Sequence, residues 1–185
     1  MKTKEKLIRQ AVSLILEKGY HGTGINEILR VSNVTKGSLY YHFPKGKDQL
    51  VTEALRSYTI KLSLQYKKLL KSADSLEDGL GKLINHAIQE LELSGYKAGS
   101  ILINVSQELG SMNKPLQATC KQLLELIINN LESFFLEYEI EKWEESARSF
   151  FISFQGAIVI SKAYQETSFL TQLKTTILSE KYLYN

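Results

Sequence analysis

The chain has 185 residues, of which 43% are hydrophobic and 23% charged, an ordinary balance for a soluble globular protein. Cys120 is its single cysteine, which excludes an intrachain disulfide and a cluster of thiolate metal ligands. Because only 2 prolines and 11 glycines interrupt the chain, the composition favours long helices over a turn-rich sheet protein.

The net charge of +3 hides an uneven distribution along the chain. Residues 1–50 carry nine lysines and arginines against four acids, and residues 51–75 carry five against two. Residues 76–185 are acidic, with nine basic residues against fourteen acids. A basic N-terminal third on an acidic remainder predicts a module that binds a polyanion, joined to a domain with another task.

The N-terminal segment does not resemble a signal peptide or a membrane span. Arg9, Gln10 and Ser13 interrupt the apolar residues between Leu7 and Leu16, so this stretch is too polar for either. We therefore expect a protein of the reducing cytoplasm that does not enter a membrane. Cys120 lies on an apolar helical stripe, which indicates a small core residue.

The first fifty residues predict three helices separated by short breaks. Residues 3–18 place apolar side chains at helical spacing, and Gly19 is expected to end that helix. Thr23 is the predicted cap of a second helix over residues 24–31. Asn33 suits the tight turn that follows, because asparagine tolerates a positive φ, and Thr35 is the predicted cap of a third helix over about 36–42.

The rest of the chain also predicts helices only. After the break at residues 43–46, a long helix is expected over 47–71, and Ser75 is the predicted cap of the next. No alternation typical of a strand persists anywhere. The predicted fold class is all-α with about nine helices, the last five over residues 76–94, 100–110, 115–138, 142–166 and 169–182.

Three short helices with a tight turn before the third are the components of a helix-turn-helix, whose third helix enters the major groove of DNA. Its leading residues would face base edges, and its later residues and the start of the next helix would meet phosphates. Taken singly, each of these side chains also fits packing or an ordinary charged surface. The predicted DNA-binding residues are Thr23, Thr35, Lys36, Gly37, Ser38, Tyr40, Tyr41, His42 and Lys47.

The run from Lys36 to Phe43, followed by residues 45–50, resembles the TetR family of bacterial repressors, as do Gly19-Tyr20, Thr23 and Ile28. The match covers residues 5–55, and its form is similar to the branch with regulators of drug-resistance and efflux genes. The chain departs from the family pattern at Gly24-Ile25 and at Ser32-Asn33. The resemblance implies a helix-turn-helix domain over residues 1–46 and an all-helical ligand-sensing and dimerisation domain over 47–185.

Two helices predict an interface with a second copy of the chain. The helix over 115–138 has one broad apolar face, and the helix over 142–166 is apolar nearly all round in its second half. The resemblance implies a four-helix bundle formed with the partner's pair, on a palindromic DNA operator; a purely intramolecular core is the alternative. The predicted interface residues are Leu123, Ile127, Leu131, Phe134, Phe150, Phe154 and Ile158.

The resemblance also implies a small molecule bound behind the long helix, whose binding releases the protein from DNA. The candidates are polar or aromatic residues on otherwise apolar faces, with His86 as the anchor, although a structural histidine is an alternative. We expect a neutral, hydrophobic or aromatic effector. The candidate ligand-binding residues are Tyr58, Tyr66, His86, Asn104, Gln107 and Phe154.

Other function classes have little support in the sequence. His21, His42 and His86 are scattered, and the chain shows neither a phosphate-binding loop nor the spacing of metal ligands, so we expect no enzyme, cofactor or metal. The main alternative is a DNA-binding regulator without a small-molecule ligand, either constitutive or controlled by a protein partner. A second alternative is an adaptor that has lost DNA binding.

Overall fold

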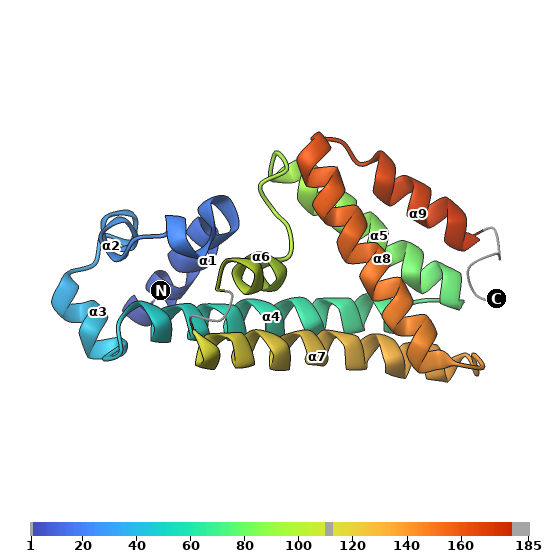
Figure 1. Cartoon of the computed structure of the whole chain (residues 1–185), viewed down its shortest axis with the longest axis horizontal. Coiled ribbons are helices and arrows are strands. Elements are labelled where there is room, and N and C mark those ends of the chain that lie inside the picture. The colour runs from blue at the N-terminus through green and yellow to red at the C-terminus, as the bar shows by residue number, and fades with distance from the viewer. Residues whose placement is uncertain (1, 110–112, 179–185) are drawn as a thin grey trace. The chain divides into compact units, whose positions relative to one another are not determined.

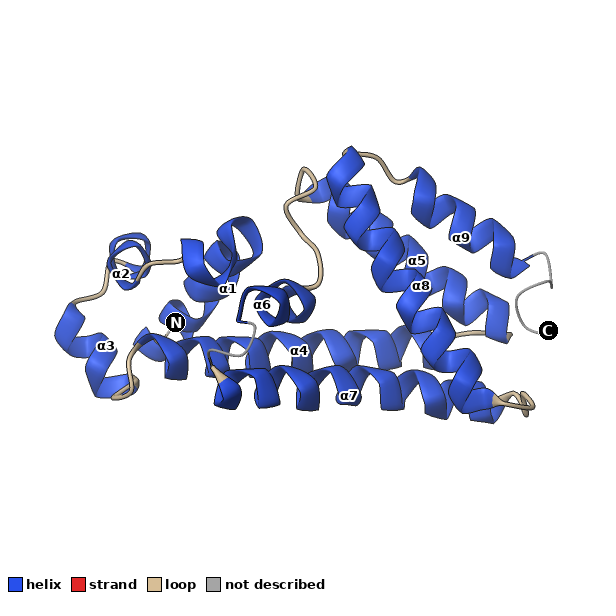
Figure 2. Ribbon diagram, in the orientation of Figure 1, coloured by secondary structure: helices blue, strands red, loops and turns tan. Residues whose placement is uncertain are grey.

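The computed structural model describes residues 2–109 and 113–178, and these residues form nine helices and no strand (Figure 2). The all-α prediction is confirmed, and the predicted helix bounds differ by a few residues; residues 179–182 of the last predicted helix lie outside the described part. The helices are α1 Thr3–Gly22, α2 Ile25–Ser32, α3 Lys36–His42, α4 Lys47–Lys71, α5 Leu76–Leu93, α6 Ile101–Leu109, α7 Lys114–Glu137, α8 Trp143–Tyr164 and α9 Ser168–Leu178.

The chain divides into two compact units (Figure 1). The first consists of residues 1–61 and 101–124, and the second of residues 62–100 and 125–185. Both α4 and α7 therefore begin in the first unit and end in the second. The predicted functional boundary after residue 46 lies inside the first unit and stays a prediction.

The three N-terminal helices and the start of α4 share one apolar core, which we call the head core. Apolar residues of α1 lie on the face that meets α2, α3 and α4, because their spacing matches the helical repeat. Burial of each large side chain of this kind contributes about 1.5–3 kcal/mol. The buried members are Leu7, Ala11, Leu14, Ile28, Leu39, Phe43, Leu50 and Ala54.

The turns around α2 and α3 follow the sequence closely, with one exception. Asn33 adopts the left-handed conformation (φ 49°), and the Thr35 hydroxyl accepts a hydrogen bond from the Ser38 N–H at 3.3 Å, so both predictions are confirmed. The prediction that Thr23 caps α2 is wrong. Gly24 is the capping residue, without a side-chain hydrogen bond, and Thr23 ends α1 instead.

The second unit has an aromatic interior. The rings of Phe150 and Phe154 stack with centroids 5.5 Å apart, and Phe135 lies 6.5 Å from Phe150. Tyr66 extends this row, with its ring 6.5 Å from Phe154. In the same unit, α5 packs against α8 and α9. Aromatic residues from α4, α7 and α8 thus form a continuous buried row.

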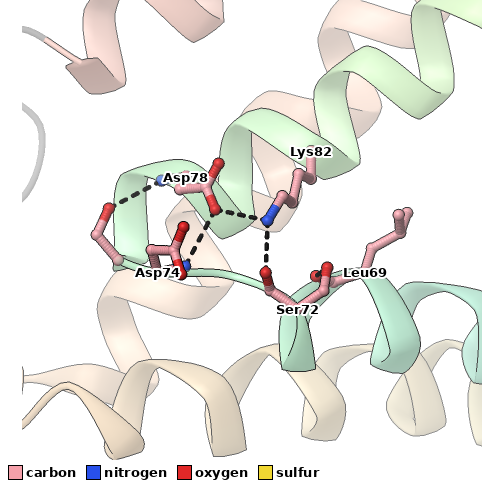
Figure 3. Close-up of polar contacts among 6 residues, drawn as sticks. Leu69, Ser72, Asp74, Asp78 and Lys82 are labelled. Atoms are coloured by element: carbon pink, nitrogen blue, oxygen red, sulfur yellow. Dashed lines mark hydrogen bonds and ion pairs between the residues drawn. The ribbon is translucent and has the colours of Figure 1, made fainter.

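Polar groups fix the corner between α4 and α5 (Figure 3). The Lys82 ammonium donates to the Ser72 carbonyl at 2.6 Å and lies 2.6 Å from the Asp78 carboxylate, which also accepts from the Asp74 N–H. The Ser75 hydroxyl accepts from the Asp78 N–H at 3.1 Å, which confirms the predicted cap. The hydrogen bonds from Lys82 and from the Asp74 N–H lower the pKa of Asp78.

Among the helices of the described ranges, none combines the length and the apolar character needed to cross a lipid bilayer.

Candidate nucleic-acid interface

The short helix α3 presents two contrasting faces. Leu39 and the following Phe43 are fully buried in the head core. On the other face Tyr41 is 81% exposed and Tyr40 is 41% exposed, although both are large aromatic residues. Burial of one face thus fixes the helix and turns the other toward solvent, where its side chains are accessible to a large partner.

The first turn of α3 offers short polar groups and open main chain. Thr35, Lys36 and Gly37 are exposed, and Ser38 is half-buried. The Thr35 and Ser38 hydroxyl oxygens lie 3.1 Å apart, so the two side chains order each other. A Cβ atom placed on Gly37 would meet no atom within 4 Å, which means that an approaching surface can come close to the backbone there.

The second turn of α3 is ordered by aromatic contacts. The Tyr41 and His42 rings meet edge to face with centroids 5.0 Å apart, and His42 is half-buried. The Tyr40 ring lies against Gly46, where an added Cβ would approach it to 3.6 Å. Because Gly46 has a φ of 69°, glycine suits this position on conformational grounds as well. Seven of the nine predicted residues, from Thr35 to His42, therefore lie together on one short segment.

Two predicted DNA-binding residues have other contacts. The Thr23 side chain is fully buried, and its hydroxyl donates to the Gly19 carbonyl at 2.7 Å, so it is not available to a phosphate. The Lys47 ammonium, expected to meet a phosphate, donates to the Tyr20 carbonyl at 2.7 Å and lies 4.2 Å from the centre of the Tyr20 ring. Burial lowers the pKa of Lys47. Both residues support the fold behind the exposed face.

Sequence reasoning missed a polar cluster around Tyr20. The Tyr20 hydroxyl donates to the Asp48 carboxylate at 2.6 Å, and the other Asp48 oxygen accepts from the Asn113 amide at 2.9 Å. Burial and the hydrogen bond to Asp48 raise the pKa of Tyr20 to about 12. The one available signal was the Gly19-Tyr20 pair, because glycine at a helix end often marks a turn with a specific partner.

The six candidate ligand-binding residues fall into two groups. Tyr66, His86 and Phe154 meet in the second unit, where the Tyr66 ring lies 5.9 Å from His86 and 6.5 Å from Phe154. Tyr58, Asn104 and Gln107 belong to the first unit. Gln107 is exposed, and the other two are half-buried.

The residues predicted to face a second copy are buried inside their own chain. Their exposed fractions run from 0% at Phe150 to 6% at Ile127 and Ile158, so their side chains contribute to the internal core. The apolar residues that do face outward on α8 are Ile152 at 71%, Val159 at 43% and Ile160 at 42%. Their contact with a second copy stays a prediction, and within the single chain the core includes Leu123, Ile127, Leu131, Phe134, Phe150, Phe154 and Ile158.

Metal-binding side chains do not gather in the described ranges. No group of three or more His, Cys, Asp or Glu side chains there could hold a metal ion. Cys120 is 1% exposed, which confirms its prediction as a core residue, and burial raises the pKa of its thiol.

Comparisons with known protein families match both parts of the chain. A sequence profile described as bacterial regulatory proteins of the tetR family matches residues 7–54. A second profile, described as the C-terminal domain of LmrA/YxaF-like transcriptional regulators, matches residues 77–176, more than half of the chain. The first match contains the whole of α3, and the second begins near the start of α5.

Individual relatives agree with these profiles. The HTH-type transcriptional regulator LmrA of Bacillus subtilis is 28% identical over 120 residues, which are 65% of this chain and 64% of LmrA. The negative transcriptional regulator IcaR of the Staphylococcus aureus biofilm operon icaADBC is 48% identical over 44 residues, 24% of each chain. The crystal structure of reduced NemR from E. coli has a TM-score of 0.85 at 17% identity, covering 96% of both chains, and therefore shares the fold.

Proposed function

Since the chain belongs to the TetR family of bacterial regulatory proteins, we propose that it is a sequence-specific DNA-binding transcriptional regulator that uses α3 to read the major groove. The observation that carries this proposal is the exposed face of α3 over a fully buried Leu39. We place such a regulator in the bacterial cytoplasm, where its DNA target lies.

The residues of α3 divide by the chemistry that each can offer to a duplex. Lys36 suits the acceptors of guanine or a phosphate, and Thr35 and Ser38 are short donors at the groove. Tyr40, Tyr41 and His42 suit phosphate oxygens along the groove edge, where contacts set position rather than sequence preference. The open backbone at Gly37 lets the helix approach closely.

The proposed DNA binding is tested by selecting duplexes from a random pool and footprinting the selected sequence. We expect a palindromic site whose half-sites lie about one helical turn apart, because two copies of α3 must reach the same side of the duplex. A protein that has become an adaptor would select no sequence. The same result would disprove the DNA-binding proposal.

We further propose that the protein is a homodimer that uses the outward face of α8. Ile152, Val159 and Ile160 recur at helical spacing on this face, and Tyr164, also on α8, is 68% exposed. Gly156 on the same exposed stretch would allow two helices to approach closely, since nothing lies within 4 Å of an added Cβ. Apolar side chains gathered in this way favour contact with another protein surface.

The dimer proposal is tested by measuring the mass of Ile152→Asp by light scattering. A buried charge at the interface should give a monomer, whereas Leu64→Asp, at a similarly exposed apolar position on α4, should leave the dimer mass unchanged. A dimer mass for Ile152→Asp would show that α8 is not the interface.

We propose that the regulator is a repressor released by a small neutral, hydrophobic or aromatic effector. The contacts among Tyr66, His86 and Phe154 support this proposal, since aromatic rings next to a phenol hydroxyl and an imidazole are groups that recognise such a ligand. The alternative is a regulator without a small-molecule ligand. A panel of neutral aromatic compounds distinguishes the two: an effector must raise the melting temperature and release the selected duplex, and Tyr66→Ala should weaken both effects.

A further inference from the structure

The last turn of α1 has an unusual backbone that faces α6. Gly19 has φ 75° and ψ −178° within an otherwise helical segment, so the helix kinks there. L-residues rarely adopt this conformation, and glycine therefore allows the kink. The main-chain N–H groups of Tyr20 and His21 follow directly on this kink. Each of these groups needs an acceptor.

Glu108 of α6 supplies those acceptors. One carboxylate oxygen accepts from the Tyr20 N–H at 3.0 Å, and the other accepts from the His21 N–H at 2.8 Å. The His21 Nε2 lies 3.1 Å from the main-chain carbonyl oxygen of Glu108. A Cβ atom on residue 19 would collide with the Glu108 carboxylate, so any side chain there would push the carboxylate away from its present place.

The other side of the same turn is held by α4. The Lys47 ammonium donates to the Tyr20 carbonyl, and the Tyr20 hydroxyl donates to Asp48. Thr23 then closes the turn by donating to the Gly19 carbonyl. The end of α1 is therefore hydrogen-bonded on one side to α6 and on the other to the start of α4, directly after α3.

We propose that Glu108 is a positioning residue for operator binding: its carboxylate fixes the kinked end of α1 and, through it, the orientation of α3. This proposal rests on the proposed DNA-binding function. Two hydrogen bonds to a charged carboxylate are among the strong polar contacts of a protein, and an amide in its place can accept from only one of the two N–H groups. Because α6 packs against α1 through this contact, a shift of α6 either breaks these bonds or moves α1.

The test compares Glu108→Gln with Glu137→Gln, an exposed residue of α7 that undergoes the same change of charge. Binding is measured to the duplex selected by the wild-type protein and to a scrambled duplex. We expect Glu108→Gln to bind the selected duplex about tenfold more weakly, the size of one charged hydrogen bond. Loss of an acid makes the protein more basic, so electrostatics alone would strengthen binding to both duplexes.

The expected result is therefore opposite in sign to the charge effect and confined to the selected duplex. As an independent reading, the amide-proton chemical shifts of Tyr20 and His21 should change in Glu108→Gln and not in Glu137→Gln. Suppose that those chemical shifts change in Glu108→Gln, but that Glu108→Gln and Glu137→Gln bind the selected duplex with the same affinity. The positioning role is then wrong. A wild-type protein that selects no sequence overturns this role and the proposed function together.

A pair of variants tests the same contact if Glu108→Gln folds poorly. Gly19→Ala should weaken specific binding for two reasons. Alanine is strained at the positive φ of residue 19, and its Cβ collides with the Glu108 carboxylate. In a Glu108→Ala background the collision is gone, so the same substitution should have a smaller effect. Additive effects of the two substitutions would contradict the proposed coupling.

Discussion

The N-terminal helices and the second unit use their outward faces in opposite ways. On α3, Leu39 is buried on one face, and the opposite face exposes lysine, hydroxyl and tyrosine groups, which suit a hydrated polyanion. On α8, Phe150 is buried on one face, and the other face exposes Ile152 and Val159, which suit another apolar surface. In both helices the residues that fix the fold are interior ones. Only the exposed side chains of each helix indicate what kind of partner it binds.

The largest effect should come from the interior of the second unit. Phe150 is fully buried and stacked on Phe154, so Phe150→Ala should lower the free energy of unfolding by about 3–5 kcal/mol. Leu64→Ala, at a position that is 64% exposed, should change it by no more than about 0.5 kcal/mol. Denaturant unfolding measures both. Similar changes in the free energy of unfolding for the two variants would contradict the assignment of Phe150 to the core and of Leu64 to the surface.

The next effect should appear in DNA binding and leave stability intact. Lys36→Ala and Tyr41→Phe should each weaken binding to the selected duplex by about 1–3 kcal/mol, because each removes a contact made by an exposed group. Lys61→Ala changes the same charge on the exposed face of α4 and serves as the control. If all three variants bind like the wild type at moderate salt, α3 is not the reading helix.

These two regions also differ in how much the sequence revealed. The helix α3 and its turn could be predicted because their signals are consecutive: Asn33 in the turn, Thr35 as the cap and the run from Lys36 to Phe43. The outward face of α8 could not, since periodicity shows that a helix has two apolar sides and not which side meets its own chain. Glu108 was missed for a similar reason, because its contacts with Tyr20 and His21 join residues far apart in the sequence.

A smaller effect distinguishes two helix caps of similar geometry. Thr35 accepts from the Ser38 N–H, and Ser75 accepts from the Asp78 N–H. Replacing either by alanine should lower the free energy of unfolding by about 1 kcal/mol. Thr35→Ala should also weaken binding to the selected duplex, whereas Ser75→Ala should not. Equal effects on binding would mean that the order of α3 has no special importance for DNA recognition.

The last effect is as small as that of a helix cap, and it should disappear at alkaline pH. Burial and the hydrogen bond to Asp48 raise the pKa of Tyr20 to about 12, whereas an unfolded tyrosine has a pKa of about 10. A raised pKa means that folding favours the protonated phenol. The stabilisation is therefore fully present below about pH 10 and is lost as the pH rises to about 12.

Tyr20→Phe isolates this contribution from that of the other nine tyrosines. At neutral pH the variant should be less stable than the wild type by about 1 kcal/mol, the size of one hydrogen bond. Between about pH 10 and about pH 12 the difference should shrink, because only the wild type then loses the phenol proton. Denaturant unfolding across this range measures the difference. A constant gap would show that Tyr20 does not donate to Asp48 in the folded protein, and the kinked end of α1 would then be held to α4 through the bond from Lys47 to the Tyr20 carbonyl.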